Sequence, residues 1–148
     1  MTVYFATDHA GFELKNELLA FVRDELGYVV EDLGATELDE TDDYPDYIHT
    51  AAKKVSERPD EARAIILGGS GEGEAIAANR HMRVRTAVYY GGPLDIVRLS
   101  REHNDTNMLS LGARFLDVET AKQAVALWLD TRFSGESRHA RRIAKLDR

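Results

Sequence analysis

The run ARAIIL at 62–67 constrains the fold more than any other stretch of this sequence. It is short and almost wholly apolar, and it leads directly into a glycine-rich loop, GGSGEGE at 68–74. A strand of this kind is typical of a parallel sheet covered on both faces, because neither face alternates with polar residues. We therefore expect helices on both sides of a buried strand at this point.

The rest of the chain alternates between short apolar runs and longer helical periods. The predicted strands lie at 3–7, 28–34, 62–67, 85–90 and 107–112. The predicted helices lie at 12–27 (with Gly27 as a C-cap), 45–57, 74–80, 94–104 and 118–133, and the tail at 137–148 can be helical. Such alternation implies right-handed crossovers. The sequence thus predicts an α/β, Rossmann-like three-layer sandwich with a five-stranded parallel sheet and a C-terminal helical tail, in one domain over 1–148, and leaves the strand order open.

Charge and cysteine content exclude several classes of function. The 148 residues include 19 Lys and Arg against 26 Asp and Glu, for a net charge of −7 at pH 7. This balance argues against binding to nucleic acid or to an anionic membrane. The chain has no cysteine, which excludes disulfides, thiolate metal sites and a cysteine nucleophile. No signal peptide and no apolar segment of about 20 residues is visible, so we expect a cytoplasmic protein.

Polar residues and glycines follow each predicted strand, where ligands bind in an open parallel sheet. They are Asp8 and His9 after the first strand, Tyr44 after the second, the glycine loop after the third, Gly91 and Gly92 after the fourth, and Arg114 after the fifth. Asp8 can be an N-cap or, with His9, a site for hydroxyls or a phosphate.

The glycine loop lacks the features of a nucleotide site. No lysine follows its glycines, as a P-loop would require, and Glu74 occupies the third glycine position of a dinucleotide fingerprint. Two interpretations stay open: a tight turn only, or a helix N-terminus whose amides bind an anion or oxyanion.

Glu74 lies at the start of the helix that follows this loop. It can be a carboxylate that complements the helix dipole, or a general base held beside an oxyanion site. Glu72, at the apex of the loop, is interpreted as solvated.

Two groups of polar residues do not follow a predicted strand. Arg138, His139, Arg141 and Arg142 are either a solvated helix end or a phosphate clamp. His103 and Asn104 end a predicted helix, which places them at the opposite edge of the sheet from the glycine loop. They form either a structural turn or part of the site of a second subunit.

Several motifs together resemble ribose-5-phosphate isomerases of type B, in a sugar-phosphate isomerase family that includes galactose-6-phosphate isomerase subunits. The resemblance runs nearly from end to end. It is carried by DHAG at 8–11, DYP at 43–45, GGSGEGEAIAANR at 68–80, SREHNDTN at 100–107, LGAR at 111–114 and the RHxRR tail.

The resemblance implies an aldose–ketose isomerase that converts ribose 5-phosphate and ribulose 5-phosphate through an enediolate, with no metal or organic cofactor. It implies Glu74 as the base, His103 for ring opening, and Ser70 as an aid to proton transfer. It implies substrate binding by Asp8, His9, Tyr44, Gly69, Gly71, Gly73, Asn104, Arg114, Arg138 and Arg142. It further implies a homodimer or homotetramer with active sites at the subunit interface.

One branch of the family has a cysteine as base, at the position of Gly68, and the other has a glutamate at the position of Glu74. This chain matches the glutamate branch. Two alternatives stay open: isomerisation of a six-carbon sugar 6-phosphate such as allose or galactose 6-phosphate, and a non-catalytic sugar-phosphate binder.

Overall fold

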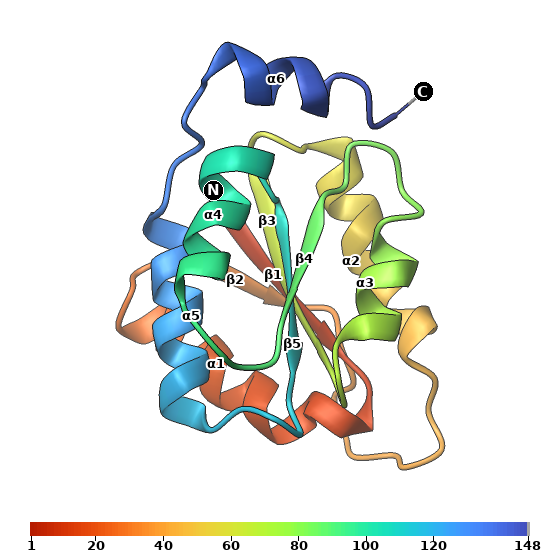
Figure 1. The fold of residues 1–148 in the computed structure, drawn as a ribbon. Helices are drawn as coiled ribbons and strands as arrows, with labels where there is room; N and C mark the ends of the chain where they lie inside the picture. The colour runs from red at the N-terminus through yellow and green to blue at the C-terminus, as the bar shows by residue number, and fades with distance from the viewer. Residues whose placement is uncertain (148) are drawn as a thin grey trace.

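The computed structural model describes residues 1–147, and its five strands form one parallel sheet between layers of helices (Figure 1). In chain order the elements are β1 (Thr2–Thr7), η1 (His9–Gly11), α1 (Phe12–Asp24), β2 (Val29–Asp32), α2 (Tyr44–Glu57), β3 (Ala62–Gly68), α3 (Glu72–Ala78), β4 (Thr86–Tyr89), α4 (Asp95–Asn104), β5 (Met108–Gly112), α5 (Val118–Asp130) and α6 (Ser137–Ile143). The predicted fold class is confirmed. No helix among the described residues is both long and apolar enough to cross a membrane.

The strand order is β2-β1-β3-β5-β4. The chain moves outward from β1 to β2, then returns past β1 to β3 and continues to the far edge at β4. Helices α1, α4 and α5 cover one face and α2 and α3 cover the other (Figure 1). The direction of the crossovers therefore reverses between β1 and β3, and in open α/β sheets ligands bind at the carboxyl ends beside such a reversal.

Strand β3 is buried on both faces, as its apolar run predicts. Ile65 and Leu67 pack in a core that includes Trp128 of α5. Ala64 and Ile66 pack in a second core against α2. Burial on both sides makes β3 the centre of the sheet and holds the loop that follows it in a rigid frame.

Some element ends differ from the prediction, each for a local reason. Strand β2 stops at Asp32 because its side chain accepts a hydrogen bond from the Gly34 amide at 2.9 Å, which turns the chain. Helix α3 begins at Glu72, two residues early, after Gly71 with a φ of 82°. Helix α5 ends at Asp130 instead of residue 133, since Thr131 is extended and its hydroxyl donates to the Leu127 carbonyl.

Lys15 ties α1 to the start of the loop that leads to α2. Its side chain is almost wholly buried, and its ammonium donates to Asp32 Oδ2 at 2.6 Å and to the Ala35 carbonyl at 2.7 Å. A buried ammonium needs such partners because the protein interior solvates charge poorly. This cluster therefore anchors the acidic loop 35–43, whose far end approaches the carboxyl edge of the sheet.

Replacement of the Lys15 partner tests that anchor. We expect Asp32→Asn to lower the free energy of unfolding by about 2 kcal/mol, because it leaves a buried ammonium without a counter-charge. The measurement is equilibrium urea unfolding. The matched control is Asp24→Asn, which removes a carboxylate from an exposed pair with Arg23 and is expected to have a much smaller effect. Equal losses in the two variants would contradict a structural role for the Lys15 cluster.

Candidate active site

The glycine loop between β3 and α3 is held in place by β5 and the turn after it. Gly71, at a φ of 82°, caps α3, and its carbonyl accepts a 2.6 Å hydrogen bond from the Ser110 hydroxyl. The amides of Ala113 and Arg114 donate to the carbonyls of Gly68 and Gly69 at 2.8 and 3.1 Å. These bonds use the loop carbonyls for structure and leave the loop with an ordered backbone at the carboxyl edge of the sheet.

The Glu74 carboxyl lies against the α-carbon of Gly68. A Cβ atom built on Gly68 would collide with Glu74 Oε1, Cδ and Oε2. Glu74 is only 4% exposed, although it belongs to the first turn of a surface helix. The Glu74 carboxyl can therefore occupy this place only because residue 68 has no side chain. The family's two alternatives, a cysteine at the position of Gly68 or a glutamate at the position of Glu74, would thus put their reactive atoms in the same place.

Burial changes the acidity of Glu74. Loss of solvent raises the pKa of its carboxyl, and the negative charge of Asp8 raises it further, against an opposing hydrogen bond from the Glu74 amide. No side chain among residues 1–147 hydrogen-bonds to this carboxyl. A carboxylate with a raised pKa and free lone pairs is a stronger base than an exposed glutamate, which suits proton transfer.

Asp8, His9 and Asp42 form a second cluster beside Glu74. Asp8 caps η1 by accepting from the Ala10 amide at 2.9 Å. His9 Nδ1 lies 2.7 Å from Asp42 Oδ1, and the His9 amide donates to the same oxygen at 3.0 Å. The polar atoms of these three residues lie within 4.8 Å of one another, close enough for a cation. The hydrogen bond between His9 and Asp42 already engages the nitrogen and oxygen that face each other, and we assign no metal there.

Tyr44 and Arg114 flank the glycine loop. A Cβ atom on Gly73 would lie 2.6 Å from the Tyr44 hydroxyl, and one on Gly69 would lie 3.1 Å from Arg114 Nη1. Side chains at these two glycines would therefore push both groups away. Ser70 is close as well, with its hydroxyl 3.3 Å from the Glu72 amide, from which it accepts a hydrogen bond.

The structure thus brings one part of the predicted site together at the carboxyl edge. This carboxyl-edge cluster consists of Asp8, His9, Tyr44, Gly69, Ser70, Gly71, Gly73, Glu74 and Arg114. Sequence reasoning did not single out Asp42. Its place in the acidic run DETDD offers no signal that separates it from its neighbours, because only the fold of the loop points one of these carboxylates at His9.

The remaining predicted residues lie at the opposite edge, beside α6 (Figure 1). Helix α4 returns from the carboxyl edge, so His103 and Asn104 at its end lie far from the glycine loop. The ring of His103 stacks on His139 of α6, with centroids 4.4 Å apart and planes 14° apart. Arg142 lines a shallow pocket with His103 and Asn104, and Arg138 pairs with Glu136 at 2.8 Å. We call His103, Asn104, Arg138 and Arg142 the amino-edge cluster.

His139 of α6 packs against His103 of α4 through its ring. It is 6% exposed, and its Nε2 has no hydrogen-bond partner among the described residues. Burial, and then the charge of His103, lower the pKa of His139. The lowered pKa favours the neutral form of the His139 ring that stacks on His103.

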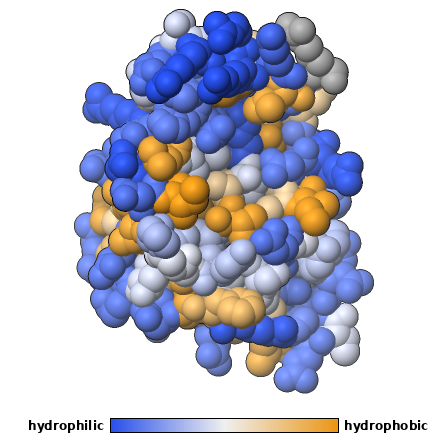
Figure 2. Space-filling model, viewed as in Figure 1, coloured by the Kyte–Doolittle hydropathy of each residue, from blue (hydrophilic) through white to orange (hydrophobic). Residues whose placement is uncertain are grey.

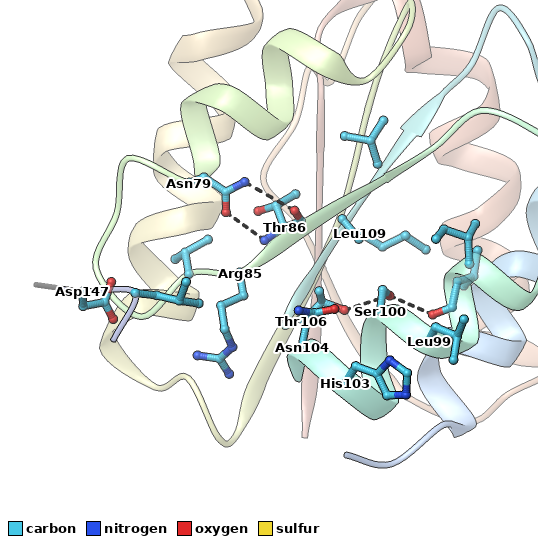
Figure 3. Close-up of a pocket in the computed structure, with 16 residues that line it drawn as sticks. Asn79, Arg85, Thr86, Leu99, Ser100, His103, Asn104, Thr106, Leu109 and Asp147 are labelled. Carbon is cyan, nitrogen blue, oxygen red and sulfur yellow. Dashed lines mark hydrogen bonds between the residues drawn. The ribbon is translucent and has the colours of Figure 1, made fainter. Parts of the chain in front are cut away.

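A cavity of about 700 Å³ with mixed polar and apolar walls opens beside the edge strand β4 and reaches His103 and Asn104 of the amino-edge cluster (Figure 3). Thr86 and Leu109 of the sheet and Leu99, Ser100 and His103 of α4 are among its lining residues. Asn79 closes one side, where its amide makes two hydrogen bonds to the backbone of Thr86. Apolar side chains gather across the middle of this face (Figure 2). The most exposed large apolar residues include Ile76 of α3, Ile96 of α4, Tyr90 and Leu146.

Comparison with known proteins gives one consistent result. A family model described as Ribose/Galactose Isomerase matches residues 3–146. The chain is 39% identical to ribose-5-phosphate isomerase B of Mycolicibacterium paratuberculosis, over 97% of this chain and 87% of that protein.

Solved structures agree with the sequence relatives. Ribose-5-phosphate isomerase B from Mycoplasma genitalium, solved with bound ribulose-5-phosphate, superposes with a TM-score of 0.92 at 32% identity, over 98% of this chain and 93% of that one. Ribose 5-phosphate isomerase B from Anaplasma phagocytophilum superposes with a TM-score of 0.90 at 40% identity, over 98% of this chain and 95% of that one. This chain belongs to the ribose/galactose isomerase family.

Proposed function

We propose that this protein is an aldose–ketose isomerase that interconverts ribose 5-phosphate and ribulose 5-phosphate. The observation that carries the proposal is the Glu74 carboxyl, buried against Gly68 beside the N-terminus of α3. A base with a raised pKa next to a ring of backbone amides is what proton transfer next to a carbonyl requires. The relatives named above act on this substrate pair, and one was solved with the ketose bound.

In the proposed reaction, Glu74 moves one proton between adjacent carbons. With the sugar ring open, the Glu74 carboxylate takes the proton from C2 of the aldose, and the C1 carbonyl becomes an enediolate oxygen. The protonated carboxyl then returns the proton to C1, while O1 gains a proton and O2 loses one. The amides of Gly69, Gly71 and Gly73 stabilise the negative charge on these oxygens, and the Ser70 hydroxyl carries the proton between them.

The amino-edge cluster supplies ring opening and phosphate binding in this proposal. His103 protonates the ring oxygen, Asn104 contacts the sugar, and Arg138 and Arg142 bind the phosphate with paired N–H donors. Within one chain α6 and the end of α4, which carry these residues, lie at the opposite edge of the sheet from the N-terminus of α3 (Figure 1). They act at the site of a partner subunit, so one complete site needs two copies of the chain.

The β4 edge is the surface through which two copies would associate. It lies between the two clusters, and its outer strand β4 pairs only with β5. The exposed apolar side chains of α3 and α4 and the cavity beside β4 lie on this face. Two-fold symmetry about this face would place each amino-edge cluster on the partner's carboxyl-edge cluster, and would do so twice, because such an interface is isologous.

A six-carbon substrate is the second candidate, because the description of the matching family model includes galactose. The same proton transfer would act on a sugar 6-phosphate one carbon longer, so the chemistry of Glu74 does not separate the two. A coupled assay with ribose 5-phosphate, allose 6-phosphate and galactose 6-phosphate separates them by kcat/KM. No turnover of any of the three would contradict catalysis and favour a sugar-phosphate binder.

Removal of the proposed base is the most direct test. We expect Glu74→Gln to lower kcat on ribose 5-phosphate by roughly 10²–10⁴-fold, the usual scale for loss of a general base. The matched control is Glu72→Gln, which makes the same change two residues away on an exposed side chain and is expected to keep wild-type turnover. Near-wild-type turnover in Glu74→Gln would exclude Glu74 as the base.

The raised pKa of Glu74 predicts how kcat/KM and the free energy of unfolding depend on pH. The base must be charged, so kcat/KM should fall on the acid side with a midpoint above the ordinary range of a glutamate. A raised pKa in the folded state also means that Glu74 contributes stability below its unfolded pKa, and that this contribution is lost as the pH rises through the folded pKa.

Glu74→Gln should therefore be more stable than the wild type at about pH 7.5 and lose this advantage at about pH 4. Urea unfolding at the two pH values measures it. A variant that is less stable than the wild type at both would show that the carboxylate stabilises the fold.

Mixing two inactive variants tests the shared site. A heterodimer of Glu74→Gln and His103→Ala has one site with both residues intact, so statistical mixing should restore about a quarter of wild-type activity. Native mass spectrometry of the mixture verifies that heterodimers form. Heterodimers without restored activity would show that Glu74 and His103 do not act across an interface.

A further inference from the structure

The pair formed by His9 and Asp42 has no part in the proton transfer assigned to Glu74. Asp42 lies on the acidic loop 35–43, and its side chain is only 8% exposed. One carboxylate oxygen receives both the ring nitrogen and the backbone amide of His9, at 2.7 and 3.0 Å. The other oxygen is buried and has no hydrogen-bond partner among the described residues. A buried carboxylate held on one histidine from two directions indicates a built arrangement rather than a chance surface contact.

We propose that Asp42 is a positioning residue for substrate binding: it accepts the hydrogen bonds from the Nδ1 and the backbone amide of His9, fixes the plane of the ring, and leaves Nε2 for the substrate. This inference rests on the proposed function and on the substrate-binding role that the resemblance to the family implies for His9. In many ligating and catalytic histidines a carboxylate binds the second ring nitrogen and thereby sets the tautomer and the orientation of the ring. Asp42 is placed to do the same for His9.

The charges around His9 support this role. Asp8 precedes it, Asp42 and Asp39 face it from the acidic loop, and Arg114 faces it from the turn after β5. The hydrogen bond to Asp42 is the largest influence and raises the pKa of His9, against the opposing effects of burial and of Arg114. Tyr47 lies beside Asp42, and burial and then the Asp42 carboxylate raise the pKa of its hydroxyl.

The contact with Asp42 is expected to extend substrate binding through His9 to higher pH. A cationic His9 attracts an anionic substrate, and this attraction is lost as the pH rises through the pKa of His9. With Asp42 in place the loss occurs at a higher pH than for an ordinary histidine. The acidic loop, which as a whole repels a phosphate, would thus favour binding through one of its carboxylates.

The test compares Asp42→Asn with Glu40→Gln. Asparagine keeps an acceptor for the His9 hydrogen atoms and removes only the charge, and Glu40 is an exposed acid of the same loop with the same charge change. NMR titration of the imidazole signals, with His9 assigned by its absence in His9→Asn, should show a raised His9 pKa in the wild type and in Glu40→Gln. It should fall toward the ordinary histidine value in Asp42→Asn.

Kinetics provide the second measurement. At about pH 8 we expect Asp42→Asn to raise KM for ribose 5-phosphate by about tenfold, with kcat within about threefold, and to move the rise of KM with pH to lower values. The inhibition constant of inorganic phosphate should follow the same pH shift. In a His9→Asn background, Asp42→Asn should have no further effect on KM, because its action passes through His9.

The NMR titration and the kinetic measurement together distinguish a failure of this inference from a failure of the proposed function. The NMR titration needs no turnover, so a protein without isomerase activity would still show whether Asp42 controls His9. An unchanged His9 pKa in Asp42→Asn, or a KM profile that does not move with pH, would overturn the positioning role. An increase in KM of equal size on adding Asp42→Asn in the His9→Asn background would assign the effect of Asp42 to loop structure instead.

Discussion

The parallel direction of all five strands is the constraint on which the arrangement of this site depends. Each strand ends at the same edge, and each helix must run back to the opposite edge before the next strand begins. Residues that follow strands, such as Glu74 and Arg114, therefore collect at one end, and residues that end helices, such as His103, collect at the other. No local change of sequence could bring His103 to Glu74 within one such chain, which is why the proposed site draws on a second copy.

Placement of Glu74 shows how the fold changes the acidity of a common side chain. The carboxyl could have pointed to solvent from the first turn of a surface helix. Instead the missing side chain of Gly68 leaves room for it against the sheet, where burial raises its pKa. A buried carboxylate without a cation beside it is unfavourable for stability, which is the usual trade between a reactive group and a stable fold.

Charge in this acidic protein is organised on a local scale. Lys15 holds the first part of the acidic loop against α1, and Asp42 at its other end holds His9. The loop thus connects a buried structural ion pair to a histidine at the candidate site. The net charge of −7 does not reveal this local arrangement. At the proposed site an anionic sugar would meet arginines and the imidazole of His9, whatever the charge of the whole chain.

Periodicity and turn chemistry by themselves determined the α/β class, the five strands, the glycine loop and the prediction that His103 lies at the opposite edge from Glu74. These follow from local patterns and from the direction of a crossover. The strand order β2-β1-β3-β5-β4, the contact of Glu74 with Gly68 and the choice of Asp42 among the acids of its loop were decided only by the tertiary structure. Each of these depends on which distant surfaces pack together, and packing between segments far apart in the chain leaves no mark on the local spacing of residues.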